Sequence, residues 1–175
     1  MTRPIFLILT AVASCAALPA CGGGGGGRPG PISGSFVQLA GPEQGKTISL
    51  GSIKCTPKPG LKEYEVEASS SDGDSLHVVL MEYQGPGERD IEFGVTKPKH
   101  RIDIDLASGH KYRFFQHLRS DLNEIYNSYC HVAIVEGGGH LNCTLLWADA
   151  GSPDFAGTEF LNNYVDANAK FDCGS

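Results

Sequence analysis

The sequence predicts an all-β domain, an antiparallel β-sandwich of about eight or nine short strands with little helix. Apolar and polar residues alternate along most of the chain after residue 35, which is the period of half-buried strands. Clusters rich in Gly, Pro, Asp and Ser interrupt this alternation roughly every 8–12 residues, as turns do in such domains. Four cysteines lie in the same region, and an even number favours two disulfides.

The alternation is clearest at residues 63–68, where apolar side chains share one face and Glu63, Glu65 and Glu67 share the other. The Asp72-Gly73 pair predicts a tight hairpin after this strand. The alternating segments, of which the first is a possible edge strand, are residues 36–39, 47–55, 63–68, 76–83, 91–95, 101–106, 111–118, 129–135, 140–147 and 165–173.

Three further stretches qualify this pattern. Residues 120–127 are predicted to be helical, with Ser120 or Asp121 as the cap. Gly51 is expected at a β-bulge, because the apolar positions change parity across it. Residues 136–139, which include three glycines, predict a hairpin loop.

The first twenty residues have the pattern of an export signal. A basic start at Arg3 precedes an apolar run, residues 5–12, that is far shorter than the roughly 20 residues needed to span a bilayer. Leu18-Pro19-Ala20 then precedes Cys21 in the arrangement of a bacterial lipobox. We expect residues 1–20 to be a lipoprotein signal peptide and Cys21 to carry a diacylglycerol, whose two chains give stable anchoring.

Two alternatives stay open at this segment. Val12-Ala13-Ser14 precedes Cys15 as a second box, although cleavage there would leave a very short apolar run. The signal could also be an ordinary secretory one, with Cys21 as a free thiol. We favour Cys21 because the glycine tract at residues 22–27 is suited to a tether.

The expected mature chain divides into a tether and one domain. Residues 21–34 comprise the acylated cysteine and a Gly/Pro-rich linker with too little apolar surface to fold. As a coil, the residues from Gly22 to Gly34 would span about 20 Å. Residues 35–175 form the single β domain. Because Gly22 follows Cys21, we expect an exported protein anchored to the outer membrane or, in a host with one membrane, to that membrane's outer leaflet.

The charge balance argues against nucleic acid as a partner. Without Arg3, 13 basic residues face 20 acidic ones, so the formal charge is −7 instead of the −6 of the whole chain. A chain this acidic is poorly suited to binding phosphate backbones or anionic lipid. The expected membrane partner is therefore reached through the lipid on Cys21, and no other cofactor is implied.

Cys55, Cys130, Cys143 and Cys173 have no spacing typical of a zinc knuckle, which favours disulfides over a metal site. Three connectivities are possible. Strand direction places Cys173 beside Cys143 and leaves Cys55 for Cys130, so Cys55–Cys130 with Cys143–Cys173 is the first expectation.

Candidate chemical groups are weak. His131 and His140 flank one hairpin and are possible metal ligands, but no third ligand is fixed nearby by spacing. Asp103 and Asp105 share a strand face as two catalytic carboxylates would, and a solvated outer face explains them more simply. The remaining groups, which fit surface or turn roles, are Glu63, Glu65 and Glu67, His100, His110 and His117, Asp72–Asp74, Asp149–Asp154 and Gly137–Gly139.

Aromatic residues at strand spacing either fill the core or line a groove for a lipid or sugar, and the core is the more usual role. They are Trp147, Tyr64, Tyr83, Phe93, Phe114 and Phe115.

With its lipobox, the run from Gly51 to Thr56 (GSIKCT) and a late Phe171-Asp172-Cys173, the chain resembles the mycobacterial LpqH-type lipoprotein antigens. The likeness covers the signal, residues 47–81 and, loosely, residues 131–173. It implies a surface lipoprotein without an established catalytic role, whose acylated end is recognised by host innate receptors. It also implies that Cys55 pairs with Cys173 and leaves Cys130 for Cys143. Cys130, Cys143 and residues 85–127 have no counterpart in the family pattern.

These observations favour a non-enzymatic, membrane-anchored envelope lipoprotein that displays a small β domain for binding, or for an antigenic or structural role. One alternative is a carrier that holds a small apolar ligand between its sheets. Another, less favoured, is an envelope metal-binding protein that uses His131 and His140.

Overall fold

The computed structural model describes residues 34–40, 46–94, 100–119, 124–149, 151–153 and 164–174. The predicted signal peptide, Cys15, Cys21 and almost all of the predicted tether lie outside these residues. Among the residues described, no helix is long and apolar enough to cross a membrane.

The described part of the chain is all-β, as predicted, and it contains no α-helix. The strands are β1 (Phe36–Ala40), β2 (Thr47–Ser49), β3 (Ser52–Lys58), β4 (Glu63–Ser69), β5 (Ser75–Leu80), β6 (Gly87–Glu92), β7 (Arg101–Asp105), β8 (Lys111–Arg113), β9 (Gln116–Arg119), β10 (Glu124–Asn127), β11 (Tyr129–Val135), β12 (Gly138–Ala148) and β13 (Tyr164–Asp172).

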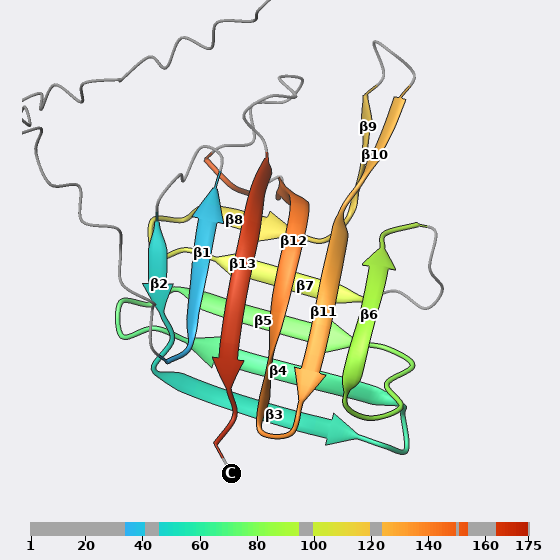
Figure 1. Cartoon of the computed structure of the whole chain (residues 1–175). Helices are drawn as coiled ribbons and strands as arrows, with labels where there is room; N and C mark the ends of the chain where they lie inside the picture. Colours follow the sequence, from blue (N-terminus) through green and yellow to red (C-terminus); the bar gives the residue numbers. More distant parts are fainter. Residues whose placement is uncertain are drawn as a thin grey trace, which may run out of the picture. The chain divides into compact units, whose positions relative to one another are not determined.

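Eleven of these strands form one antiparallel sheet, which has two arms that meet at β12. We call β2, β1, β13, β12, β11 and β6 the long arm, and β8, β7, β5, β4 and β3 the cross arm. Figure 1 shows the strands of the cross arm running across the direction of those in the long arm. β12 pairs with β11 up to Thr144 and with β8 only at Trp147 and Ala148. The sheet therefore curls into a half-barrel.

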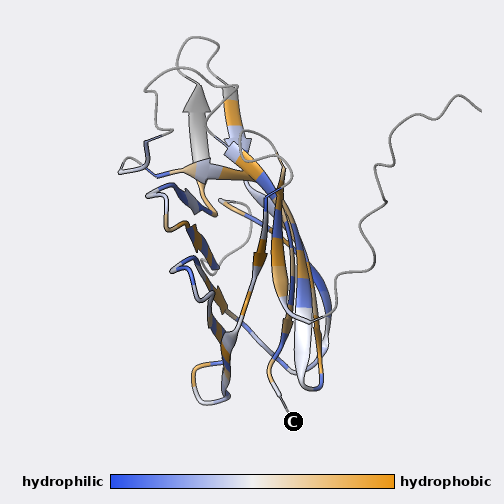
Figure 2. Ribbon diagram, turned by 90° about the vertical axis from the view of Figure 1, so that its left-hand side faces the viewer, coloured by the Kyte–Doolittle hydropathy of each residue, from blue (hydrophilic) through white to orange (hydrophobic). Residues whose placement is uncertain are grey.

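The predicted β-sandwich is confirmed only as an antiparallel all-β domain with two disulfides. Hydrogen bonding passes from one arm to the other through β12, so the two arms belong to a single sheet. Figure 2 shows the strands of the cross arm end-on beside the long arm.

The core lies where the inward side chains of both arms meet. Strict alternation along β4, β5 and β13 buries every second residue, because successive side chains in a strand point to opposite faces. Val66, Val78 and Val165 are fully buried, and residues of both arms form one continuous cluster. Burying each such side chain contributes about 1.5–3 kcal/mol.

The predicted helix at residues 120–127 is wrong over its described part. Glu124–Asn127 is strand β10, which pairs with β9 in a separate two-stranded sheet. A short helix has a costly nucleus and needs an apolar face to bury. Ile125, the large apolar residue of this segment, is 58% exposed. Residues 120–123 lie outside the described residues.

Two segments predicted as single strands are each divided. Residues 47–55 contain β2 at one end of the sheet order and the start of β3 at the other. Gly51 therefore stands where the chain passes from the long arm to the cross arm, in place of the expected bulge. Residues 111–118 likewise contain β8 and part of β9.

Candidate functional site

The corner of the half-barrel is a left-handed residue in β12. Leu145 has a φ of 56°, and the β12–β13 register shifts between Cys143 and Leu146. A non-glycine residue in this region is strained, so neighbouring groups must hold it there. The amide of Leu145 donates to Oδ1 of Asp166 at 3.1 Å. This bulge lets β12 leave β11 and continue alongside β8.

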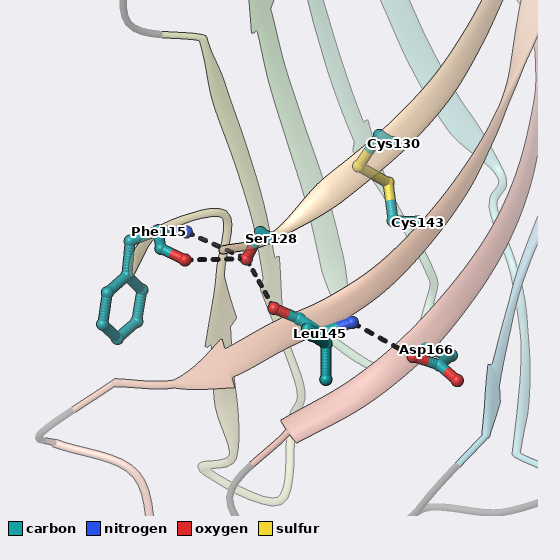
Figure 3. Close-up of a disulfide and its surroundings, with 6 residues drawn as sticks. All are labelled: Phe115, Ser128, Cys130, Cys143, Leu145 and Asp166. Carbon is teal, nitrogen blue, oxygen red and sulfur yellow. Dashed lines mark hydrogen bonds between the residues drawn. A yellow bond between two sulfur atoms is a disulfide. The ribbon is translucent and has the colours of Figure 1, made fainter. Parts of the chain in front are cut away.

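Ser128 fastens the same corner from the other side (Figure 3). Its side chain is fully buried, and its Oγ accepts the amide proton of Phe115 at 3.1 Å. The hydroxyl proton faces two carbonyls, those of Phe115 at 2.9 Å and of Leu145. One hydroxyl therefore joins the start of β11, the link between β8 and β9, and the bulge in β12.

The disulfides are Cys55–Cys173 and Cys130–Cys143. The pairing expected from strand direction is therefore wrong, and the structure has the pairing that the family resemblance implies. Cys130 lies directly opposite Cys143 in the β11–β12 hairpin, with their Cα atoms 4.1 Å apart. Ala167, not Cys173, lies opposite Cys143 on β13. Cys173 follows the end of β13, where its Cα is 5.6 Å from that of Cys55 on β3.

His131 and His140, the predicted metal candidates, lie on the outer face of the long arm with ring centroids 6.3 Å apart. Nδ1 of His131 is 2.9 Å from Oδ1 of Asp90 on β6. Hydrogen bonds from His131 and Tyr129 lower the pKa of the Asp90 carboxyl below its ordinary value. A second carboxylate, that of Glu88, lies 4.0 Å from Nε2 of His131, so the structure places two carboxylates beside this histidine.

A tighter group of potential ligands lies on the cross arm, where the sequence drew no metal prediction. The ligand atoms of Glu65, Glu67 and His77 lie within 4.8 Å of one another. Lys58 Nζ is 2.5 Å from Glu65, and Lys54 Nζ is 3.5 Å from Glu67. The hydrogen bonds from Lys58 and His77 lower the pKa of Glu65. Lysine partners on both glutamates make this group an ion-pair network.

The carboxylates of Asp103 and Asp105 are also held by cations. Asp103 lies 2.5 Å from Nε of Arg101 and 3.6 Å from Nε of Arg113. Arg113 also pairs with Asp105 and, at 3.3 Å, with Asp149. Asp103 is only 8% exposed, so the expected solvated face is here a compact ion-pair network. These contacts give the two carboxylates structural partners.

Most of the predicted groove aromatics fill the core. Tyr64, Phe114 and Trp147 are buried, and Tyr83 and Phe93 pack against the core cluster. His100 is buried as well, and its Nδ1 accepts the amide proton of Met81 at 3.1 Å. Burial, and then the charge of Arg89, lower the pKa of His100.

A hollow with a volume of about 580 Å³ lies on the outer face of the long arm, next to the β11–β12 turn. We call it the hairpin groove. Its lining residues are Phe36, Ala133, Val135, Glu136, Gly137, Gly138, Gly139, His140, Asn168, Lys170, Phe171 and Asp172. None of the predicted groove aromatics is among them.

Sequence reasoning treated the three glycines of this groove only as a turn. The turn itself is tighter than predicted, because β11 and β12 already pair at Val135 and Gly138. Gly138 and Gly139 are therefore strand residues, and glycine inside a strand often marks a close approach of backbone. That signal could have located the groove.

Comparison of the chain with protein-family models, with curated proteins and with solved structures gave no match.

Proposed function

We propose that this chain is a non-enzymatic envelope lipoprotein, anchored by a diacylglycerol on Cys21, that displays its β domain at the surface of the membrane. The observation that carries the proposal is the order of features at the start of the chain. A short apolar run precedes Leu18-Pro19-Ala20-Cys21, and a glycine tract follows it. The cysteine supplies the thiol that is acylated, and the tether provides the distance from the membrane.

The disulfides support export. Stable disulfides form in oxidising compartments, and this domain has two. Cys130–Cys143 is buried, and Cys55–Cys173 joins the cross arm to the end of the long arm. A domain stapled in this way suits continued exposure outside the cytoplasm.

The ion pairs on the cross arm support a display role in place of catalysis. The carboxylate pairs that could act as acid and base are bound by Lys or Arg. We further propose that the two arms pack face to face as the predicted sandwich does, making the domain a rigid module.

The test is the mass of full-length protein purified from membranes of a bacterial lipoprotein-processing host. Wild-type protein should begin at Cys21 and carry a diacylglyceryl group. Cys21→Ser should abolish both cleavage and acylation, whereas Cys15→Ser, the matched control, should change neither. Soluble wild-type protein without lipid would contradict the proposal, and loss of acylation only in Cys15→Ser would move the anchor to Cys15.

A further inference from the structure

The hairpin groove is built by strand register. On the outer face, one row of residues crosses four neighbouring strands. From β1 to β11 it is Phe36, Lys170, His140 and Ala133. In the next row toward the turn, Gly138 stands between Asp172 and Val135. Gly138 has no side chain, so it lines the groove with backbone alone at this position.

Close packing of the backbone explains why glycine is needed at this part of the groove. A Cβ on Gly138 would lie 2.4 Å from the carbonyl oxygen of Phe171, closer than real Cβ contacts. A Cβ on Gly139, on the other face, would lie 2.7 Å from the Phe171 ring. Neither position accepts a side chain without movement of β13. The depression is therefore a fixed feature of the hairpin.

The groove has the size and surface of a site for an alkyl chain. Its volume of about 580 Å³ is within the usual 300–1,000 Å³ range of ligand sites. From β1 to β11 it crosses three gaps between strands, about 14 Å in all. Val135 on one side is 59% exposed, and Phe36 on the other is partly exposed. An extended apolar chain would cover both.

The rim of the groove carries charges of both signs. Lys170 lies in the row beside Phe36, whereas Glu136 and Asp172 lie toward the turn. An anionic head group would be repelled by the two carboxylates and attracted by only one lysine. A zwitterionic head group can instead place its phosphate near Lys170 and its ammonium near the carboxylates. The charges therefore favour a zwitterionic phospholipid.

The position of the groove brings it within reach of the membrane. Phe36 follows Gly34, the last residue of the proposed tether, and Ser35 Oγ accepts the amide proton of Asp172 at 2.8 Å. The tether therefore joins the domain beside the groove. As a coil with a span of about 20 Å, the proposed tether would keep the start of β1 within roughly that distance of the lipid.

We infer that the hairpin groove binds one acyl chain of a zwitterionic phospholipid from the membrane that holds the anchor. This inference rests on the proposed function, because the tether brings the groove to the lipid. Binding is non-covalent: the exposed faces of Val135 and Phe36 lose contact with water, and the head group pairs with the charged rim.

The experiment uses full-length acylated protein reconstituted into phosphatidylcholine vesicles that contain phosphatidylcholine with a diazirine near the end of one acyl chain. After irradiation, peptide mass spectrometry maps the adducts. Most adducts should fall on the start of β1 and on the β11–β12 turn. Val135→Asp should lower their yield at least fivefold.

Ile125→Asp is the matched control, because the exposed fraction of Ile125 is 58% and that of Val135 is 59%. Ile125 lies before β11, whereas Val135 is its last residue. The Ile125→Asp substitution should leave the groove adducts unchanged. Adducts elsewhere in wild-type protein, or equal loss in both variants, overturn the inference. The mass at Cys21 is read separately. Groove adducts on protein that lacks a diacylglycerol on Cys21 would support the binding site but contradict the proposed anchor.

Discussion

The outer faces of the two arms are built by the same strand alternation, but only the long arm has a groove bordered by apolar side chains among its polar residues. Across the cross arm, one register row places opposite charges next to one another. From β3 to β8 it is Lys54, Glu67, His77, Asp103 and Arg113. The corresponding face of the long arm has apolar Phe36 and Val135 around a glycine.

The difference shows that the pairing register of the strands, more than their composition, decides which part of the surface can bind a ligand. On the cross arm, Glu65, Glu67, Asp103 and Asp105 each form an ion pair with a cation from the neighbouring strand. On the long arm, Gly138 presents backbone alone, and the apolar side chains of Phe36 and Val135 border the groove beside it. The cross-arm face therefore stabilises the domain, and the long-arm face is open to a ligand.

The largest expected effect separates the disulfide between the arms from the disulfide within one arm. Replacing Cys55 and Cys173 with Ser should lower the free energy of unfolding by about 5 kcal/mol, and replacing Cys130 and Cys143 by about 3 kcal/mol. The loops closed are 118 and 13 residues, and the longer loop loses more entropy. Urea unfolding of both double variants measures the difference. A larger loss for the hairpin pair would show that the arms do not depend on the bond between them.

The second prediction concerns the close approach of Gly138 to the backbone of β13 beneath the groove. Gly138→Ala should cost about 1–3 kcal/mol because its Cβ would collide with the Phe171 carbonyl. Gly60→Ala, in a cross-arm turn with no atom within 4 Å of the new Cβ, should be nearly neutral. Thermal unfolding compares the two. Equal stability would mean that β13 moves freely away from β12.

In the ion-pair network of the cross arm, the loss of stability on substitution should be larger for a buried residue than for an exposed one. Asp103→Ala should cost about 1–3 kcal/mol, because it removes a buried acceptor from Arg101 and Arg113. Lys54→Ala, whose side chain is 72% exposed, should cost about 0–1 kcal/mol. Urea unfolding at low and high salt distinguishes them, with the weaker salt dependence expected at Asp103. Similar costs would argue against a compact network.

The smallest effect concerns pH. Burial lowers the pKa of His100 below its ordinary value of 6.5, so the unfolded chain binds this proton more readily than the folded one. Stability should therefore be full above about pH 6.5 and decline as the pH falls toward the lower folded value. His100→Asn, which keeps an acceptor for Met81, should flatten this decline, whereas His131→Asn should retain it. Denaturation between pH 7.5 and 5 gives both slopes, and a steep slope in His100→Asn would assign the proton elsewhere.

Local patterns predicted strands well because one buried face imposes a period of two, as at Tyr64, Val66 and Ala68. They did not predict which strands are neighbours. Residues 47–55 look continuous, but the chain changes arm at Gly51. The reason is that long-range pairing depends on the whole sheet, which no local window contains.

The disulfide error has a similar cause in the length of one turn. A loop of residues 136–139 would place Cys130 opposite Leu145. The actual turn is shorter, so Val135 pairs with Gly138 and Cys130 comes opposite Cys143. The groove was missed for the same reason, because Gly138 was assigned to the loop. The lipid anchor on Cys21 stays a prediction.

The bond between Cys55 and Cys173 also sets an order of events. A chain is made from its N-terminus, so the Cys55 thiol is present long before Cys173, and Cys130 comes between them. During that interval, Cys55 can oxidise with Cys130. The hairpin bond guards against this error, because Cys143 follows Cys130 closely and the two meet as soon as β11 and β12 pair. Among the four cysteines of the domain, closure of the hairpin bond first would leave Cys55 and Cys173 as the remaining pair, so early pairing of β11 with β12 would favour the correct bond between the arms.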